Sequence, residues 1–260
     1  MLASGRRILL TGGCGAIGAV AGRALAGAGA VVVVNDILPA DEARALLDDD
    51  RLQYVQADGS DEAEAAQLLA MAIEAAGPLT DVILLAGIVR TGGLLEQSAE
   101  NFNAVLRVNV VAAALTAQAA VREWKNSGAS GNLVFVSSWV QDVPWPGIAP
   151  YSASKAALRS LARSFAREFA VDGIRANVLA PGIVGVGMAR NQWNEEPDFR
   201  LRARRAVPLG QLQDPDSVAD ALVFLCSPMS SYMTGSTLVV DGGASLYPLD
   251  PEELVDDDGH

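Results

Sequence analysis

The chain has 260 residues, 50% of them hydrophobic, and a formal net charge of -12. That length can form the core of one large α/β domain. The negative charge disfavours a nucleic-acid backbone or an anionic membrane surface as partner, because like charges repel at long range, and so favours a small-molecule ligand. The two cysteines, Cys14 and Cys226, have neither metal-ligand spacing nor the pattern of a disulfide framework, so we expect no metal site and a cytoplasmic location.

The two ends of the chain predict a protein that is neither exported nor anchored. The apolar run near the N-terminus is too short for a signal peptide, and no segment is expected to approach membrane-spanning length. Residues 249–260 gather acidic side chains after a proline and include the only histidine, His260. We expect this stretch to be a solvated acidic tail, which leaves residues 1–248 as the folded domain.

Seven apolar runs rich in β-branched residues predict strands. Most are apolar on both alternations, as a parallel sheet covered on both faces requires. In chain order they are RILLT from Arg7, VVVVN from Val31, LQYVQA from Leu52, DVILLAG from Asp81, NLVFVSS from Asn132, IRANVLA from Ile174 and TLVVDGG from Thr237.

Alanine- and leucine-rich segments between these runs predict helices over 17–28, 40–49, 61–76, 98–124, 151–171 and 214–227. Ser60, Ser98 and Asp214 are the expected N-caps of three of them. Strands and helices therefore alternate, which predicts an α/β fold: a single-domain, Rossmann-like, doubly wound parallel sheet of about seven strands with right-handed crossovers.

A glycine-rich turn, TGGCGAIG from Thr11 to Gly18, follows the first predicted strand and opens the first helix. Glycines there let backbone N–H groups approach a pyrophosphate at the helix N-terminus. The second strand ends at Asp36, where a carboxylate can accept both hydroxyls of an adenosine ribose. A 2′-phosphate at about 5 Å would be repelled by roughly 3 kcal/mol per unit charge, so the sequence predicts NAD rather than NADP.

The segment APYSASKAAL, from Ala149 to Leu158, places Tyr151 and Lys155 one helical turn apart. At about 100° per residue, Lys155 falls on the buried stripe of its helix, while Arg159 and Arg163 fall on the other side. A phenol needs about 4 kcal/mol of phenolate stabilisation to act as a base near pH 7. An ammonium about 4 Å away at an effective dielectric near 20 provides roughly that much, so we expect the pKa of Tyr151 to be lowered.

In order and spacing these motifs resemble the short-chain dehydrogenase/reductase family over nearly the whole chain. The matching stretches are TGGCGAIG, Asp36, ADGSD with Asp58, LLAG ending at Gly87, VLRVNV with Asn109, LVFVSS with Ser138, YSASK, NVLAPGIV and SYMTGSTLVVDGG.

The resemblance implies a role for each matching residue. Tyr151 would be the acid/base, Lys155 its partner and a ligand of the nicotinamide ribose, Ser138 a ligand of the substrate oxygen, and Asn109 the anchor of a water that joins Lys155 to solvent. The implied contacts of NAD are Gly12, Cys14, Gly15, Ile17, Gly18, Asp36, Asp58, Gly59, Gly87, Tyr151, Lys155, Pro181, Gly182 and Val184. The family also implies a homotetramer built from the helices around 98–124 and 151–171.

The sequence departs from the family pattern at three places. Ala16 replaces the middle glycine of the phosphate loop, Leu84 and Leu85 replace two asparagines, and Val186 replaces a threonine that contacts the nicotinamide carboxamide. None of these changes touches the serine, tyrosine and lysine set.

The expected activity is NAD-dependent interconversion of a secondary alcohol and a ketone by hydride transfer. A sugar, sugar acid or cyclic alcohol is the favoured substrate. The alternative is reduction of a 3-oxoacyl thioester on an acyl carrier protein, which the net charge of -12 and Asp36 disfavour. A non-catalytic dinucleotide sensor and a methyltransferase remain further hypotheses, and neither would require YSASK.

Side chains around the expected site suggest the kind of substrate. Trp139, Trp145 and Trp193 offer faces that suit sugar or alicyclic rings, although packing explains them equally well. The segment 183–210 is expected to cover the substrate, and its arginines either receive a carboxylate or form a solvated helix face. These arginines are Arg190, Arg200, Arg202, Arg204 and Arg205.

Overall fold

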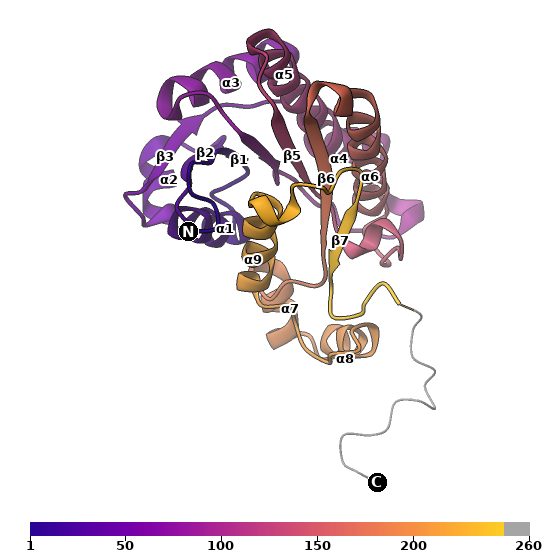
Figure 1. Cartoon of the computed structure of the whole chain (residues 1–260). Coiled ribbons are helices and arrows are strands. Elements are labelled where there is room, and N and C mark those ends of the chain that lie inside the picture. Colours follow the sequence, from indigo (N-terminus) through magenta and orange to yellow (C-terminus); the bar gives the residue numbers. More distant parts are fainter. Residues whose placement is uncertain (247–260) are drawn as a thin grey trace.

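The structure of the chain, a computed structural model, describes residues 1–246, so the predicted acidic tail 249–260 lies outside the described residues. Seven parallel strands form one sheet in the order β3-β2-β1-β4-β5-β6-β7, and all seven predicted strands are confirmed (Figure 1). Their bounds are β1 (Arg7–Thr11), β2 (Val31–Asp36), β3 (Leu52–Gln56), β4 (Asp81–Leu84), β5 (Gly131–Val136), β6 (Ile174–Pro181) and β7 (Thr237–Val240).

Helices cover both faces of the sheet. On one face lie α1 (Ala16–Gly27), α2 (Ala40–Leu47) and α9 (Pro215–Leu225), and on the other lie α3 (Glu62–Ala76), α4 (Ala99–Leu106), α5 (Ala112–Ser127) and α6 (Ala149–Phe169). The neighbours Leu9 and Leu10 of β1 are both fully buried, the first in the core beneath α3, α5 and α6 and the second in the core beneath α1 and α9. The prediction of strands buried on both faces is therefore confirmed.

Two of the three expected helix caps are present. The Ser98 hydroxyl accepts a hydrogen bond from the backbone N–H of Asn101, and the Asp214 carboxylate accepts one from Asp216. The prediction of Ser60 is wrong by one residue, because Asp61 caps α3. The N–H of Ser60 is bound by the carboxylate of Asp58 at 3.0 Å, so Ser60 belongs to the preceding turn.

The predicted helix over 98–124 is interrupted and longer than expected. A π-helical turn, η2 (Arg107–Val111), separates α4 from α5, and the whole run extends to Ser127. This run, Ala99–Ser127, is long and apolar enough to cross a membrane by length and composition, so the expectation that no segment approaches that length is wrong. The apolar composition of this run reflects packing against the sheet, since 44% of its most apolar window is buried inside the fold.

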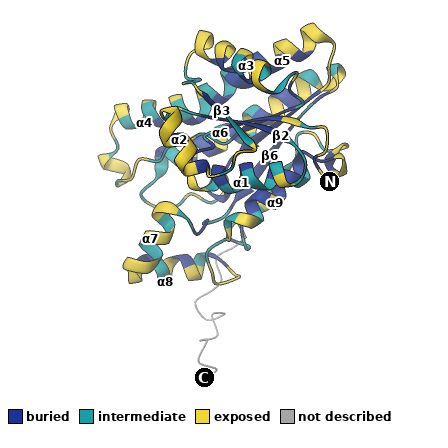
Figure 2. Cartoon of the chain, turned by 90° about the vertical axis from the view of Figure 1, so that its left-hand side faces the viewer, coloured by how far each residue is buried: buried dark blue, intermediate teal, exposed yellow. Residues whose placement is uncertain are grey.

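Two helices were not predicted from the sequence, α7 (Gly187–Glu195) and α8 (Pro197–Ala206). They project beyond the carboxyl ends of β6 and β7 and carry large exposed surfaces (Figures 1 and 2). Only Phe199 and Ala203 of α8 are buried, and no residue of α7 is. Such a narrow apolar stripe gives little helical periodicity to detect.

Candidate active site

The predicted site residues follow the carboxyl ends of six different strands, so the parallel sheet brings them to one edge. β1 and β4 are neighbours at the centre of the sheet. After β1 the chain continues to β2 on one side of this pair, and after β4 it continues to β5 on the other side. Ligands of open parallel sheets bind in the crevice at such a switch point. There Gly12 has a φ of +67°, and a Cβ on it would lie 2.6 Å from the Cα of Ala86. Only glycine fits this approach.

The glycine loop leaves the N-terminus of α1 open. A Cβ on Gly18 would lie 2.5 Å from the Cα of Gly13, so this glycine lets the helix pack against the loop. Gly15 is the N-cap of α1 and has no side-chain cap, and both Gly15 and Ala16 are exposed. The methyl group of Ala16, where the family has glycine, therefore lies in open space. The N–H groups at the start of α1, which no side chain caps, fit a pyrophosphate.

Asp36 ends β2 beside this loop. Its Oδ2 accepts a hydrogen bond from the backbone N–H of Cys14 at 3.1 Å, and its Oδ1 accepts one from Ile37 at 2.8 Å. Burial, with a smaller contribution from the charge of Asp36, raises the pKa of the Cys14 thiol to about 11. The Cys14 thiol is thus uncharged at neutral pH. The bond from the Cys14 N–H to Asp36 joins the glycine loop to the end of β2.

Ser138, Tyr151 and Lys155 meet where β5 ends and α6 begins. Ser138 is 7% exposed and precedes a short 3-10 turn, η3 (Trp139–Gln141). Lys155 is 3% exposed, its Nζ donates to the carbonyl of Val136 at 2.8 Å, and it lies 5.3 Å from the centroid of the Tyr151 ring. The prediction that Lys155 lies on the buried stripe of its helix is confirmed.

Burial dominates the titration of this pair. It raises the pKa of Tyr151 to about 12, an effect opposed by a hydrogen bond with Ser138, and it lowers the pKa of Lys155 to about 8. The sequence-based expectation of a lowered phenol pKa is therefore wrong for this arrangement, because it counted the ammonium charge and left out desolvation. At neutral pH the phenol holds its proton, which is the form that can donate to a ketone oxygen.

Asn109 lies in the π-helical turn η2 and is fully buried. Its Oδ1 accepts from the N–H of Ile88 at 2.7 Å, and its Nδ2 donates to the carbonyl of Ile88 at 3.0 Å and to Ser154 Oγ at 2.9 Å. Asn109 thus fastens the loop after β4 to α6. A Cβ on Gly87 would lie 3.2 Å from Asn109 Oδ1 and 3.6 Å from Lys155 Nζ, so these three predicted residues converge.

The remaining predicted contacts lie along the same edge. Asp58 and Gly59 follow β3, and a Cβ on Gly59 would lie 3.1 Å from Thr116 Oγ1. Leu84 is 2% exposed within the core, so its replacement of asparagine adds apolar packing. Thr11 holds the same loop through its hydroxyl, which accepts from the N–H groups of Leu85 and Ala86 at 3.2 and 3.3 Å.

The loop after β6 holds Pro181, Gly182 and Val184 and is tied to a residue that the sequence analysis missed, Gln213. The N–H of Gly182 donates to Gln213 Oε1 at 2.7 Å, and Val184 pairs with Gln213 in an isolated parallel bridge. No motif singles out this glutamine, because its role depends on the approach of two segments distant in sequence.

Aromatic side chains form a wall between α8 and the catalytic residues. Trp139 and Trp145 meet edge to face with centroids 5.6 Å apart, and Trp145 meets Phe199 of α8 at 6.4 Å. Tyr151 and Trp145 pack against the same small apolar cluster around Trp139. The guanidinium of Arg202 lies 5.7 Å from the Trp145 ring, whereas Arg204 lies over Trp193.

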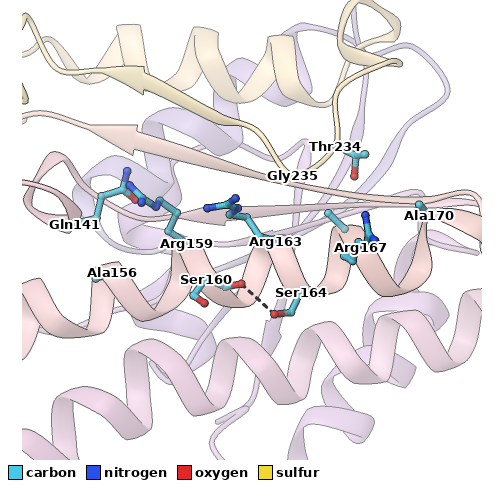
Figure 3. Close-up of a pocket in the computed structure, with 11 residues that line it drawn as sticks. Gln141, Ala156, Arg159, Ser160, Arg163, Ser164, Arg167, Ala170, Thr234 and Gly235 are labelled. Carbon is cyan, nitrogen blue, oxygen red and sulfur yellow. Dashed lines mark hydrogen bonds between the residues drawn. The ribbon is translucent and has the colours of Figure 1, made fainter.

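A separate groove of about 930 Å³ lies on the outer side of α6 (Figure 3), and neither Tyr151 nor Lys155 lines it. Arg159, Arg163 and Arg167 project from α6 along it, beside Thr234 and Gly235. Arg159 pairs with Asp142, whose loop follows η3. The predicted placement of Arg159 and Arg163 opposite the lysine stripe is confirmed, and none of the predicted catalytic residues lines the groove.

Comparison with known proteins identifies a matching family and similar dehydrogenases. A protein-family model described as "Enoyl-(Acyl carrier protein) reductase" matches residues 13–245. A 2,5-dichloro-2,5-cyclohexadiene-1,4-diol dehydrogenase of Sphingobium indicum is 34% identical over 94% of this chain and 97% of its own length. A cis-4-hydroxycyclohexanecarboxylate dehydrogenase of Sinomonas cyclohexanicum is 35% identical over 92% of this chain and 96% of its own.

Among solved structures, a gluconate 5-dehydrogenase of Burkholderia cenocepacia in complex with NADP and tartrate is similar with a TM-score of 0.86. It is 30% identical, and the match covers 93% of this chain and 96% of that one. The chain belongs to the short-chain dehydrogenase/reductase family. It is an oxidoreductase that acts on alcohols and binds a nicotinamide dinucleotide.

Proposed function

We propose that the enzyme prefers NAD and interconverts a cyclic or sugar-derived secondary alcohol and its ketone, with Tyr151 as the proton-transfer group. The observation that carries the proposal is the arrangement of Ser138, Tyr151 and a buried Lys155 beside the glycine-lined crevice. The bound dinucleotide supplies the hydride acceptor in oxidation and the hydride donor in reduction.

The protein residues handle the proton and the oxygen. In reduction the Tyr151 phenol donates its proton to the ketone oxygen, while the Ser138 hydroxyl donates a hydrogen bond to that oxygen as negative charge develops. In oxidation the phenolate form accepts the hydroxyl proton of the alcohol. Lys155 favours that form as the charged partner beside the ring, and Asn109 holds Gly87 and the start of α6 around it.

The preference for NAD rests on Asp36. Its carboxylate is fixed at the end of β2 by the N–H groups of Cys14 and Ile37, facing the phosphate loop. A fixed negative charge there accepts ribose hydroxyls and repels a 2′-phosphate. The similar gluconate 5-dehydrogenase has NADP in its structure, so the two cofactors must be compared directly on this protein.

The substrate class rests on the aromatic wall and on Arg202. Trp139 is buried behind Trp145, and the half-buried Trp145 offers an aromatic surface that packs well against a six-membered ring. Arg202, held over Trp145, supplies a cation at the rim of the same wall. Two of the relatives above are named for cyclic substrates and one structural neighbour for a sugar acid. A ring-bearing hydroxy acid is therefore the favoured substrate.

The test is a panel of secondary alcohols with each cofactor. Hydroxycyclohexanecarboxylates, gluconate, glucose, cyclic diols and uncharged cyclohexanols are assayed for NADH or NADPH formation, and a 3-oxoacyl thioester is assayed in reduction. We expect the highest kcat/KM with NAD and a cyclic or sugar-derived alcohol. Activity confined to the thioester with NADPH would refute the proposal.

We also propose that the enzyme works as a homo-oligomer joined through the outer side of α6. Small exposed residues repeat along that side at Ala153, Ala156, Ser160 and Ser164, which permits close helix packing. Light scattering should then give a mass that is a multiple of 27.0 kDa. Ser160→Arg should shift that mass toward the monomer, and a monomeric wild-type protein would rule the interface out.

A further inference from the structure

Gln213 makes contacts at both ends of the loop that follows β6. Its side-chain Oε1 accepts from the N–H of Gly182 at 2.7 Å, and its Nε2 donates to Ser217 Oγ at 2.9 Å. Its backbone N–H donates to the carbonyl of Ile183, and its carbonyl accepts from the N–H of Gly185, both at 2.8 Å. One residue thus sets the backbone from Gly182 to Gly185.

Ser217, which accepts the hydrogen bond from the Gln213 amide, is itself held in place. Ser217 Oγ donates to the carbonyl of Asp214 at 2.7 Å, and Asp214 caps α9. The Gln213 amide is therefore held from two sides. Its Nε2 is bound by the first turn of α9, and its Oε1 binds the loop. Such a chain of bonds fixes the rotamer of a side chain that is otherwise free to reorient.

The loop that Gln213 holds borders the catalytic residues. Ile183, directly after Gly182, packs against the same apolar cluster around Trp139 as Tyr151 does. The loop has no room behind Gly182, because a Cβ on Gly182 would lie 2.8 Å from the Cα of Asp241. At Gly182 the loop can therefore shift only away from Asp241, toward the site that the dinucleotide would occupy.

We propose that Gln213 is a positioning residue that holds the Gly182–Gly185 backbone against the nicotinamide half of the bound dinucleotide. The inference rests on the proposed function, because it assumes that the nicotinamide lies at this loop. It also accounts for Val186, which offers no hydroxyl to the carboxamide: the backbone of the loop, fixed by Gln213, takes over the orientation of the ring.

Removing the side-chain acceptor should loosen the loop without unfolding it. The N–H of Gly182 also reaches the carbonyl of Val240 at 3.0 Å, and the backbone bonds of residue 213 do not depend on its side chain. The expected defect is therefore in ligand positioning, while the thermal unfolding midpoint stays close to that of the wild type.

The test compares two ligands that differ in the nicotinamide. NADH and ADP-ribose share the adenosine, the pyrophosphate and the second ribose, and their Kd values are measured by titration without substrate. We expect Gln213→Leu to raise the Kd of NADH about tenfold and to leave that of ADP-ribose within about twofold. Gln213→Glu keeps an acceptor for Gly182 and should restore most of the NADH affinity. Gln211→Leu, at an exposed glutamine two positions earlier, is the control and should bind both ligands like the wild type.

Two results would overturn the proposal: an unchanged NADH affinity in Gln213→Leu, or an equal loss for both ligands, which would indicate a general change in the fold. If Gln213→Leu does not fold, Gln213→Asn, whose amide is one carbon too short to reach Gly182, carries the same expectation. A wild-type protein that binds ADP-ribose and does not bind NADH would refute the proposed function itself, which keeps the two failures distinct.

Discussion

The catalytic centre and the α7–α8 segment are built in opposite ways. Ser138, Lys155 and Asn109 are nearly or fully buried on elements of the main sheet and its covering helices. Lys155 donates to β5 and Asn109 to α6, whereas Ser138 accepts a bond within its own turn. The α7–α8 segment is mostly exposed, carries five arginines and touches the site through Phe199 and Arg202. In the proposed function, the rigid elements position the reacting groups and the sparsely packed α7–α8 segment selects the substrate.

The difference teaches where sequence change is tolerated. Burying Lys155 costs desolvation free energy that the apolar side chains of the core do not incur. The substrate-facing segment has few buried side chains and can change its polar residues with little effect on stability. The following variants test this division, from the largest expected effect to the smallest.

Lys155→Met should abolish activity and stabilise the free protein. Burial lowers the pKa of Lys155 from 10.5 to about 8, a shift worth roughly 3 kcal/mol. Below pH 8 the folded and unfolded states both hold the proton, so the full cost of burying the charge opposes folding. Between about pH 8 and 10.5 only the unfolded state keeps it, and stability rises with pH.

The measurement is denaturant unfolding of Lys155→Met and the wild type at pH 7 and at pH 10. The variant should be more stable at pH 7 and lose most of this advantage at pH 10, while its turnover falls by about 10³-fold. Lys125→Met removes the only other lysine, an exposed partner of Asp172, and should leave turnover unchanged. A Lys155→Met protein that is less stable at pH 7 would contradict the desolvation argument.

Asp36→Asn should relax the choice of cofactor. The amide keeps an acceptor for one of the two loop N–H groups and removes the charge, so the ratio of kcat/KM for NAD over NADP should fall by about 100-fold. Steady-state kinetics with both cofactors measures the ratio. Asp41→Asn, at an exposed carboxylate in the first turn of α2, is the control. An unchanged ratio in Asp36→Asn would remove the basis for the NAD preference.

Arg202→Gln should act only on charged substrates. An exposed cation is worth about 1 kcal/mol, so kcat/KM for a hydroxycyclohexanecarboxylate should fall about fivefold, and that for the uncharged cyclohexanol should stay the same. Arg205→Gln, at another exposed arginine of α8, should affect neither substrate. Equal losses on both substrates would assign Arg202 to packing on Trp145 rather than to the carboxylate.

The sequence was sufficient for the parts of the structure that rest on local patterns. The seven strands, the glycine turn and the burial of Lys155 follow from periodicity of 2 or 3.6 and from glycine spacing, and all are confirmed. The helices α7 and α8 were missed because they bury too few residues to show helical periodicity. The π-helical turn at Asn109 and the role of Gln213 were also missed, because both depend on contacts between segments far apart in the chain, which a local pattern does not contain.

The pKa of Tyr151 shows a second limit. The four-residue spacing of Tyr151 and Lys155 correctly predicted that the ammonium lies beside the phenol. The spacing could not give the depth of burial, and burial raises the pKa of Tyr151 instead of lowering it. The phenol is therefore an acid in the free protein, and its use as a base depends on what the complete site adds.

The most direct test of the central claim is the activity of Tyr151→Phe beside its affinity for NADH. The substitution removes the phenolic oxygen and keeps the ring that packs beside Lys155 and Trp139. With the best alcohol of the panel, turnover should fall by at least about 10³-fold while the Kd of NADH stays within about twofold of the wild type. Tyr151→Phe turning over at the wild-type rate would show that the proton is carried by another group and would contradict the account.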